Sequence, residues 1–416
     1  MLEQSKVMIA QENHNFSNQF TTAICGLRYV MIYLGVWPGQ KYQNLYRFIW
    51  FFHLASLIFL ASGSVGGIVV LRHDINKLIN NLSMSSPMIL ISCKWLTFSL
   101  RQKLCKKLMH SMDEDWVNLR KDTFIYKSVP DSKRVITNHY QASTVFVYTF
   151  LIVATIATIN FATDSFLSLS NRDNNTDQDN LLPMPYSWYP VDYNRSGYIV
   201  QFLVVAQIIS MVTTFLATTA VDGFFVAAIL HVSSQLKILT YFAEEIAYRP
   251  SHPEHYRIEI REMVKRHQVL LNVAATLQEF YRLIALQHVM ACVLALCFLE
   301  CSFLMELQEN GASKTILLKF GLFAIGSLET AFIYCFAGNS LINQGCALGL
   351  AIYSSKWYNF ERSINLSLSI VMIRAQKPIE ISAANIFPLT LENFTVIVKV
   401  AASYLSTLRA YSMAEA

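Results

Sequence analysis

Charged residues are scarce in this sequence. Of its 416 residues only 15% are Asp, Glu, Lys or Arg, whereas 54% are hydrophobic, and the mean hydropathy is +0.36. Water-soluble domains carry about 25% charged residues, and the apolar residues here gather in long blocks rather than at the spacing of a globular core. The composition argues against a soluble enzyme and indicates transmembrane helices.

Two features of secreted proteins are also missing. The eight cysteines lie mostly in or beside apolar blocks, so they predict no disulfide framework. The first 20 residues lack the charged start and apolar core of a secretory signal. We therefore expect the first membrane span to act as its own signal anchor.

Signatures of catalysis and of nucleic-acid binding are absent as well. The sequence has no HExxH, GxSxG or Walker A motif and no Gly-rich dinucleotide turn. Three histidines, His252, His255 and His267, have no cysteine at ligand spacing, which favours a solvated loop over a metal site. No basic helix with interleaved aromatic residues is present. We expect no enzyme activity, no cofactor and no nucleic-acid partner.

Seven apolar blocks are long enough to cross about 30 Å of hydrocarbon at about 1.5 Å per residue. They cover residues 48–71, 79–100, 142–163, 198–221, 285–306, 315–338 and 389–408. A shorter apolar stretch at 22–36 contains Arg28 and ends at Pro38-Gly39, which predicts a re-entrant or interfacial segment. The predicted fold is an all-α membrane protein with seven transmembrane helices.

The basic residues predict the orientation of these spans. With the N-terminus in the cytoplasm, 24 of the 33 Lys and Arg residues lie in cytoplasmic segments and 6 lie outside. The positive-inside rule therefore places the N-terminus in the cytoplasm and the C-terminus outside the cell. In the long outer loop, 164–196, sequons predict glycosylation at Asn174 and Asn194. The aromatic end of this loop is expected to form a lid over the outer end of the fourth span.

Helical periodicity continues past the membrane in three places. Residues 198–232 form one helix of about 50 Å, which is expected to carry Asp222 and His231 into the cytosol. A second helix begins near Pro253 and runs into the fifth span. A third covers 344–374. Amphipathic helices need partners, so we expect these three to pack on one another and on neighbouring subunits.

Ionisable residues inside membrane spans are functional candidates by default. We expect Lys94 to extend to the cytoplasmic interface along its apolar stem. His53 is predicted to be an interhelical hydrogen-bond donor. Glu300, Glu329 and Lys319 either pair with a partner or face a hydrated cavity.

The last span carries small and hydroxyl residues at helical spacing, among them Ser403, Thr407 and Ala410. Such a stripe is either a close helix contact or, where several copies surround an axis, the lining of a water-filled pore with Thr407 at its neck. Lys399 argues against a cation pore at its own depth unless its side chain turns away or meets a carboxylate.

The outer halves of spans 2, 3, 4 and 6 combine apolar walls with one or two polar groups. This composition suits a small volatile or lipid-like ligand, and ordinary packing within the bundle is the alternative for each residue. The candidate ligand-binding residues are Met84, Met88, Ile156, Ile159, Asn160, Phe202, Val205, Ile209, Phe320 and Phe323.

The C-terminal quarter of the chain resembles the insect odorant receptor family. The most specific segments are Gly338-Asn339-Ser340-Leu341, Tyr353 with Trp357-Tyr358, Arg374-Ala375-Gln376-Lys377-Pro378, Leu391-Glu392-Asn393-Phe394 and Ser403-Tyr404-Leu405. The segment Trp188-Tyr189-Pro190-Val191-Asp192 is similar to the second outer loop of that family.

This resemblance implies an odorant-gated, non-selective cation channel in the plasma membrane of olfactory sensory neurons. In that family four subunits form a central pore from the last span, held by a cytoplasmic anchor, and ligand-specific members work with a shared co-receptor, Orco. The chain resembles a ligand-specific member, because it has no long insertion between spans 4 and 5. The implied partners are Orco, membrane lipid and a small hydrophobic volatile ligand.

The resemblance also assigns residues and segments. It places Thr407 and Ala410, with Ser403 on the same stripe, in the pore, and it places Tyr353, Trp357 and Tyr358 in the anchor. The expected segments are 1–44 as a cytoplasmic N-terminus with the re-entrant or interfacial helix, 45–338 as spans 1 to 6 with the ligand cavity and cytoplasmic extensions, 339–388 as the anchor, and 389–416 as the pore-lining helix and a short outer tail.

Two other classes of protein remain as alternatives. A G-protein-coupled receptor also has seven spans, but it predicts the opposite orientation together with DRY-like and NPxxY-like motifs, which this sequence lacks. A transporter would show paired halves with broken helices, and no such pairing is visible.

For a channel, a ligand that binds the open form better shifts the population toward it. Changes at Thr407 should then alter conductance, and changes at Phe202 and Met88 should alter ligand preference.

Overall fold

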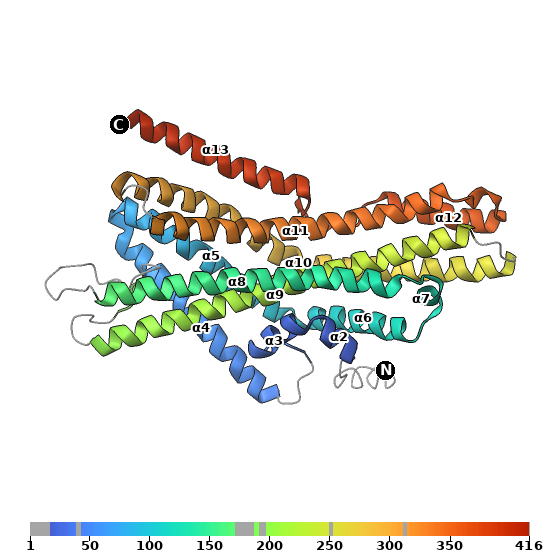
Figure 1. Ribbon diagram of the computed structural model, residues 1–416, viewed down its shortest axis with the longest axis horizontal. Coiled ribbons are helices and arrows are strands. Elements are labelled where there is room, and N and C mark those ends of the chain that lie inside the picture. The colour runs from blue at the N-terminus through green and yellow to red at the C-terminus, as the bar shows by residue number, and fades with distance from the viewer. Residues whose placement is uncertain are drawn as a thin grey trace.

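The computed structural model describes residues 17–38, 43–170, 187–190, 197–248, 253–310 and 314–415. Long helices run side by side along one axis and form an elongated bundle (Figure 1). The elements in chain order are α2 (Asn18–Ala23), α3 (Cys25–Tyr33), α4 (Gln43–Val70), η2 (Leu71–His73), α5 (Ile75–Leu100), α6 (Gln102–Arg120), α7 (Phe124–Ser128), α8 (Ser132–Ser170), α9 (Gly197–Tyr248), α10 (Pro253–Asn310), α11 (Lys314–Ser354), η3 (Trp357–Asn359), α12 (Arg362–Gln376), β1 (Ser382–Ala383), β2 (Phe387–Pro388) and α13 (Leu391–Glu415).

Five helices in the described part of the chain are long and apolar enough to cross a membrane. They are α4 with η2, α8, α9, α10 and α11, which carry the first and the third to sixth predicted spans. The second and seventh predicted spans lie in α5 and α13, helices of 26 and 25 residues. About 20 residues of helix cross the hydrocarbon core, so both are also long enough for a span.

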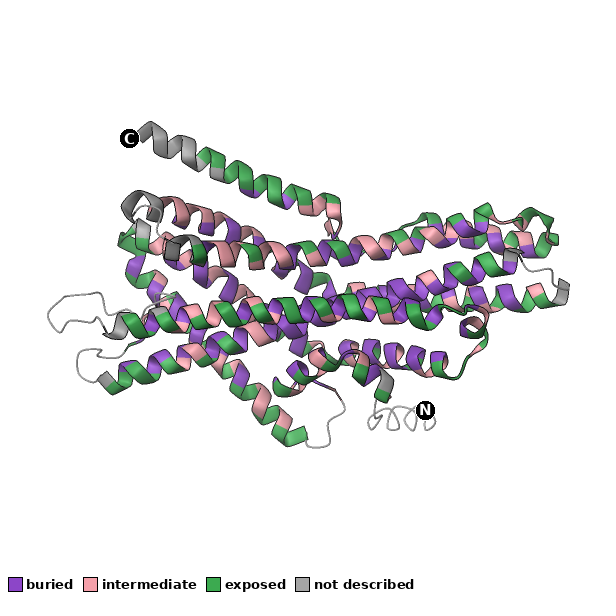
Figure 2. Cartoon of the chain, in the orientation of Figure 1, coloured by how far each residue is buried: buried purple, intermediate pink, exposed green. Residues whose placement is uncertain are grey.

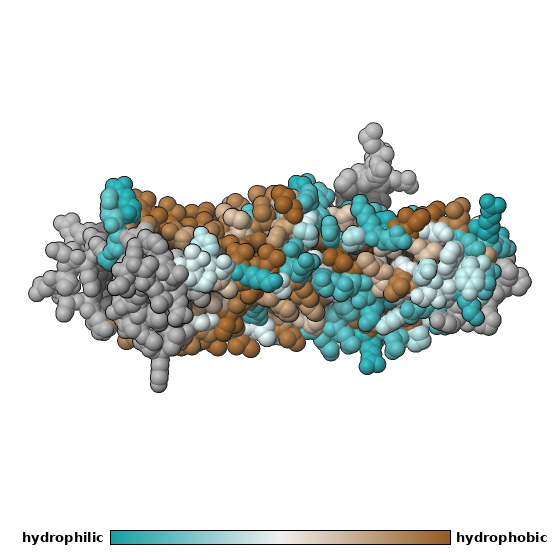
Figure 3. Space-filling view, turned by 90° about the horizontal axis from the view of Figure 1, so that it is seen from above, coloured by the Kyte–Doolittle hydropathy of each residue, from teal (hydrophilic) through white to brown (hydrophobic). Residues whose placement is uncertain are grey.

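On the face shown in Figure 3, hydrophobic side chains predominate over one half of the bundle and most hydrophilic side chains lie over the other. Within the apolar half, exposed residues include Ile152 and Ile159 on α8 and Phe202 and Ile209 on α9. A water-soluble monomer rarely exposes so extended an apolar surface. Contact with lipid explains why these side chains do not pack inside the protein.

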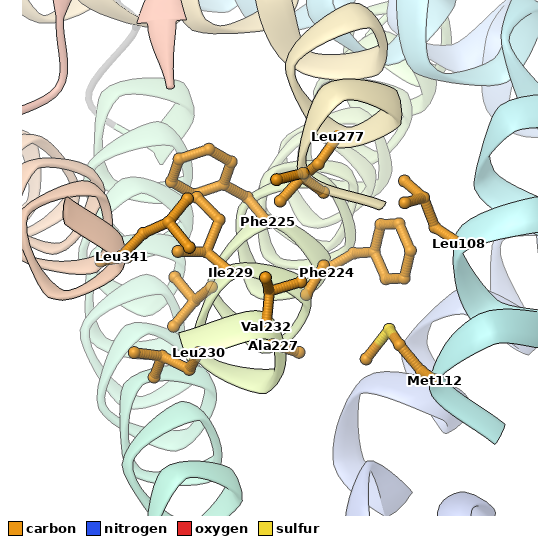
Figure 4. Close-up of a cluster of buried hydrophobic side chains, with 14 of the residues drawn as sticks. Leu108, Met112, Phe224, Phe225, Ala227, Ile229, Leu230, Val232, Leu277 and Leu341 are labelled. Atoms are coloured by element: carbon orange, nitrogen blue, oxygen red, sulfur yellow. The ribbon is translucent and has the colours of Figure 1, made fainter. Parts of the chain in front are cut away.

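Helix α9 is the centre of the bundle, and all its residues from 217 to 236 are buried (Figure 2). A helix that is apolar on every side must be surrounded by other elements, and here α6, α10 and α11 pack around it. Side chains that point in different directions from α9 meet these helices in one core, shown by Leu108, Met112, Phe224, Phe225, Ala227, Ile229, Leu230, Val232, Leu277 and Leu341 (Figure 4). The long helices therefore pack on one another, as predicted.

The same packing surrounds two polar residues of α9. Asp222 and His231 are both buried within the bundle, with 1% and 2% of their surface exposed, and the expectation that this part of α9 lies on the cytosolic side stays a prediction. The helix also continues to Tyr248, well beyond the predicted end at Val232. The surrounding helices cover this part of α9, so its polar side chains need partners inside the protein.

His231 finds its partners in a buried cluster with Asp115 of α6 and Arg266 of α10. His231 Nε2 lies 2.9 Å from Asp115 Oδ2, and Arg266 Nη2 lies 2.7 Å from Asp115 Oδ1. Burial disfavours the charged carboxylate, yet Arg266 and His231 together hold the pKa of Asp115 below its ordinary value. The ionised Asp115 side chain therefore connects α6 with α9 and α10.

The predicted start of the helix near Pro253 is confirmed, because α10 begins at that residue. Proline is favoured in the first helical turn, where its missing N–H costs no hydrogen bond. The expectation of a solvated histidine loop is wrong for His267, which is buried on α10, whereas His255 is exposed on the same helix. His252 lies outside the described residues.

The helix predicted over 344–374 is interrupted. Helix α11 ends at Ser354, the chain reverses through η3, and α12 begins at Arg362. The Asn365 side chain donates to the carbonyl oxygen of Phe360 at 2.9 Å, which stabilises the turn. Helix α12 then packs back on α11, where Gly349 faces Ala375 so closely that an added Cβ would crowd it. The periodicity was correct for both helices, but it does not reveal a reversal between them.

The apolar stretch near the N-terminus forms two short helices, α2 and α3. Phe20, Leu27 and Met31 pack into the main core, and each helix is too short to cross a membrane. The stretch ends in a tight turn at Gly35, whose φ of 73° is readily accessible to glycine. Whether this region lies at the interface stays a prediction.

The loop segment 187–190 lies across α4 and the start of α9. Trp188 N–H donates to the carbonyl oxygen of Gly63 at 3.0 Å. The Tyr189 ring stacks on Phe59 with centroids 4.6 Å apart, and it packs with Leu203 of α9. The predicted lid over the start of α9 is confirmed for Tyr189, whereas Trp188 lies against α4. Gly63 and Gly66 leave the space for this close approach.

We expect Gly66→Ala to lift this segment from α4. The added Cβ would lie 2.6 Å from the carbonyl oxygen of Trp188, a backbone atom that cannot move independently. Amide exchange at Trp188, measured by hydrogen–deuterium exchange mass spectrometry, should become about tenfold faster, because its hydrogen bond to Gly63 opens more often. Ser62→Ala, an exposed change one turn away, is the control. Equal exchange in both variants would show that the segment does not depend on this contact.

Candidate ligand-binding site

A cavity of about 120 Å³ lies between α5, α8, α9, α10 and α11. An engineered cavity of about 150 Å³ binds benzene, so this space suits a molecule of similar size. Most of its wall is apolar, which is typical of small-molecule sites. The apolar lining consists of Pro87, Met88, Leu90, Ile91, Phe150, Val153, Ala154, Ala157, Met211, Phe215, Ala291, Ala295, Leu322, Phe323 and Gly326.

Small side chains keep this space open. Ala154 and Ala157 on α8, Ala291 on α10 and Gly326 on α11 all line the cavity, so three helices present little bulk to it. Pro87 stands inside α5 at the cavity wall. Proline has no N–H for the helical hydrogen bond and its ring crowds the preceding turn. The regular packing of α5 is therefore interrupted where the cavity lies.

One end of the cavity is polar and contains a buried ion pair. Lys94 Nζ donates to Asp222 Oδ1 at 2.6 Å and to Oδ2 at 2.9 Å. The Tyr334 hydroxyl also donates to Asp222 Oδ1 at 2.6 Å, and Lys94 Nζ lies 3.4 Å from His288 Nδ1. These four side chains come from α5, α9, α10 and α11, and all of them are buried.

Each charge in this cluster has a partner, which offsets the cost of removing both charges from water. The Tyr334 ring lies in a stack, 3.9 Å from the Phe225 ring and 3.9 Å from the His288 ring.

The expectation that Lys94 extends to the interface is wrong, because Lys94 is only 3% exposed and pairs within the bundle. The sequence contained a signal for this pair, namely two opposite charges in apolar surroundings. Each of them needs a partner there, and the other charge can supply it.

The predicted ligand-binding residues divide into two sets. Met88 and Phe323 line the cavity. Met84 and Phe320 are buried next to it, in a cluster with Phe323. The structure does not bring the other six to the cavity. Asn160 is partly exposed. The remaining five are 45 to 71% exposed on the surface of the bundle: Ile156, Ile159, Phe202, Val205 and Ile209.

The physical reason for this division is helix rotation. Apolar side chains serve equally well against lipid and against a cavity, so hydrophobicity does not tell which face of a span points inward. The small residues that open the cavity carried the missing signal, since Ala154, Ala157 and Gly326 interrupt otherwise bulky spans.

Two other predicted polar residues have partners. His53 Nδ1 lies 3.2 Å from Thr213 Oγ1, and His53 Nε2 lies 3.2 Å from the carbonyl oxygen of Tyr33, which confirms the interhelical hydrogen bond. Glu329 accepts a hydrogen bond from Thr149 at 2.8 Å. The Lys319 side chain lies outside the described residues.

A short hairpin connects α12 to the last helix. Strands β1 and β2 pair antiparallel around a turn in which Ala384 and Asn385 have positive φ. Gln278 of α10 holds this hairpin, since it accepts from Ser382 N–H at 2.9 Å and donates to Asn385 Oδ1 at 2.7 Å. Asn393 then donates to the carbonyl oxygen of Pro388 at 2.6 Å, so the start of α13 is held against the hairpin.

Helix α13 stands away from the rest of the bundle over most of its length (Figure 1). Near its start, Ile397 and Ala401 pack against Leu296 of α10. The predicted pore residues Ser403 and Thr407 are exposed, and the Thr407 hydroxyl donates to the Ser403 carbonyl at 2.9 Å. The side chain of Ala410 lies outside the described part, as do Asn174 and Asn194.

The predicted anchor residues lie at the far end of α11. Tyr353 and Tyr358 are 69% and 65% exposed, whereas Trp357 packs against the main core. Two large aromatic side chains are thus largely exposed on the surface of the chain. Within the described residues, no group of three or more His, Cys, Asp or Glu side chains is arranged to hold a metal ion.

Comparison with known families gives one match over most of the chain. A family model described as "7tm Odorant receptor" matches residues 74–402. Among curated proteins, Odorant receptor Or2 of Anopheles gambiae is 29% identical over 151 residues, 36% of this chain and 39% of that protein. Odorant receptor 82a of Drosophila melanogaster is 25% identical over 238 residues, 57% of this chain and 60% of that protein.

The matched part of the chain therefore spans about two fifths to three fifths of the length of these two relatives. A solved structure, that of the olfactory receptor OR5 from Machilis hrabei in complex with eugenol, has a TM-score of 0.79. It is 16% identical and covers 95% of this chain and 100% of its own. At this identity, the likeness shows a common fold.

Proposed function

This chain belongs to the insect odorant receptor family, and on that premise we propose that it is the odorant-binding subunit of a heteromeric, ligand-gated, non-selective cation channel in olfactory sensory neurons. The observation that carries the proposal is the cavity between α5, α8, α9, α10 and α11, with apolar walls and one polar end. Such a site suits a small volatile molecule. The OR5 receptor of similar fold was solved with eugenol bound.

The proposed topology has seven membrane spans in the plasma membrane, with the N-terminus in the cytoplasm and the C-terminus outside. The distribution of Lys and Arg supports this orientation. The half of the bundle with exposed apolar side chains lies in the lipid (Figure 3), and the polar half lies in the cytosol. Asn174 and Asn194 then carry glycans on the outer side.

We propose that the chain assembles with the co-receptor Orco into a heterotetramer. Helix α13 supports this, because it leaves the bundle and exposes both Val396 and Tyr404. Neighbouring subunits cover these residues, and Ser403, Thr407 and Ala410 line a central pore. Tyr353, Trp357 and Tyr358 hold the cytoplasmic anchor, 339–388, against the adjacent subunits.

Whole-cell current in cells that express this chain, the co-receptor or both tests the function. G-protein signalling is blocked while a broad panel of volatile compounds is applied. A fast ligand-evoked cation current in the pair alone is the expected result. If the pair reaches the surface without current, and this chain alone gives a slow second-messenger response after the block is lifted, a metabotropic receptor is the better description.

Substitutions should separate the pore from the ligand cavity. Thr407→Leu narrows the pore and should lower unitary conductance by about twofold or more while ligand ranking stays the same. Met88→Ala enlarges the cavity and should change the half-maximal concentration about tenfold without altering unitary conductance. Phe202→Ala is the matched control for Met88, since Phe202 is 71% exposed on the outer surface. A change in ligand ranking by Thr407→Leu would contradict these roles.

A further inference from the structure

The hydrogen-bond donors at the polar end of the cavity already have acceptors. Lys94 directs its donors to both oxygens of Asp222 and toward His288 Nδ1. Because His288 Nδ1 accepts there, its proton lies on Nε2, which faces Cys292 Sγ at 3.6 Å on the same helix. The cationic group at the cavity is therefore fully engaged within the protein.

Three threonine hydroxyls in the lining also donate to backbone carbonyls. Thr214 Oγ1 donates to Ser210 O at 2.8 Å, Thr218 Oγ1 donates to Thr214 O at 2.9 Å, and Thr330 Oγ1 donates to Ser327 O at 3.1 Å. A hydroxyl has one proton and two lone pairs. Once the proton is used, the oxygen offers the cavity only an acceptor.

Gln287 adds a further acceptor oxygen. Its Nε2 donates to Thr97 Oγ1 at 3.1 Å, while its Oε1 is buried without a hydrogen-bond partner in the described part of the chain. Gln287 lines the cavity, and a buried carbonyl oxygen without a partner is costly. A donor brought by the ligand would remove that cost.

The net charge of the polar end also limits the ligand. Lys94 and Asp222 neutralise each other, so a charged ligand would meet no free counter-ion there. Ser327 lines the cavity with a hydroxyl group, which can act as donor or acceptor. The acceptor oxygens of Thr214, Thr218 and Gln287 outnumber the two donors that remain, which are the Ser327 hydroxyl and the second N–H of Gln287.

We propose that the cavity selects neutral molecules of about benzene size that carry one hydrogen-bond donor, namely small alcohols or phenols, over ethers or ketones of the same shape. This inference rests on the proposed function of the same cavity. A site that hydrogen-bonds a hydroxyl rejects the analogue without it more strongly than a hydrophobic pocket rejects a missing methylene group.

Three isomers of one formula test the proposal at constant size. Benzyl alcohol and para-cresol carry a donor, whereas methoxybenzene is only an acceptor. In cells that express this chain with its co-receptor, both donors should have half-maximal concentrations about tenfold below that of methoxybenzene, which corresponds to 1.4 kcal/mol. In the purified complex, the donors should also raise the thermal unfolding temperature more at equal concentration.

Matched threonine variants assign the effect to the cavity. Thr218→Val keeps the shape of the side chain and removes one of the three acceptors, so it should weaken the preference for the donors while methoxybenzene still acts. Thr219→Val is the control, since its hydroxyl makes the same kind of bond, to Phe215 O at 2.8 Å. The Thr219 side chain is fully buried next in sequence and is not part of the cavity lining.

Equal potency of the three isomers, or failure of all three to bind the purified complex, would overturn the proposal. An equal loss for all three in Thr218→Val would also overturn it, because that pattern means damaged packing. Thermal stabilisation by the donors without any current would instead contradict the proposed channel function and leave the ligand class in place. A current with other volatiles, without donor preference among the isomers, would retain the channel and reject the ligand class.

Discussion

Replacing Lys94 with methionine is expected to prevent most of the protein from reaching the cell surface. The variant leaves the Asp222 carboxylate buried, with Tyr334 as its remaining close donor. Removing one partner of a buried pair costs about 3–5 kcal/mol, a large share of a total stability of about 5–15 kcal/mol. Surface biotinylation and the thermal unfolding of detergent-solubilised protein measure the effect.

A second variant separates charge from packing. Adding Asp222→Leu to Lys94→Met removes both charges, and apolar replacement of a whole buried pair is often close to neutral. The double variant should therefore recover surface expression. Lys265→Met is the control, because the Lys265 pair with Glu262 is exposed to solvent and contributes about 0–1 kcal/mol. A single variant as stable as the native chain would mean that this pair is not a structural requirement.

Gly338→Ala is expected to abolish the ligand-evoked current. A Cβ at Gly338 would collide with the backbone carbonyl oxygen of Leu389, directly before α13. The hairpin is held on α10, where Ser382 N–H donates to Gln278 Oε1 at 2.9 Å and Ala384 N–H donates to Arg282 O at 2.9 Å, so it cannot shift without losing those bonds. Overpacking of this kind costs about 1–3 kcal/mol, and the movement would displace the root of the proposed pore helix. Whole-cell current normalised to surface expression measures the loss.

Gly321→Ala on the same helix is the matched control, because an added Cβ there has no neighbour within 4 Å. Both substitutions raise helix propensity to the same extent. If Gly338→Ala conducts normally at equal surface expression, α13 does not depend on the close approach of α11 and the hairpin. The contact also explains the glycine of the Gly338-Asn339-Ser340-Leu341 segment, since any side chain at that position meets a backbone atom.

Local properties of this chain were predictable from its sequence. Apolar blocks identified the helices that carry the spans, because covering about 30 Å of hydrocarbon requires about 20 residues whatever lies beside them. The start of α10 at Pro253 followed from the preference for proline in the first turn. His53 was predicted to have an interhelical partner, since a lone buried imidazole needs one.

Contacts between segments far apart in the chain needed the tertiary structure. Lys94 and Asp222 are separated by 128 positions in the sequence. The apolar residues around Lys94 fit a side chain that extends to the membrane interface as well as they fit one that pairs with Asp222. The reversal between α11 and α12 was also hidden, because helical periodicity is the same in one long helix and in two short ones.

The residues around the cavity show most clearly which properties the sequence could predict and which needed the tertiary structure. Met88 and Phe323 line it, whereas Phe202 and Ile159, which are also apolar, face outward. In a membrane both faces of a span are apolar, so hydrophobicity determines that a segment is a span but carries no information about its rotation. Only the packing of the helices around one another decides which side chains line the cavity.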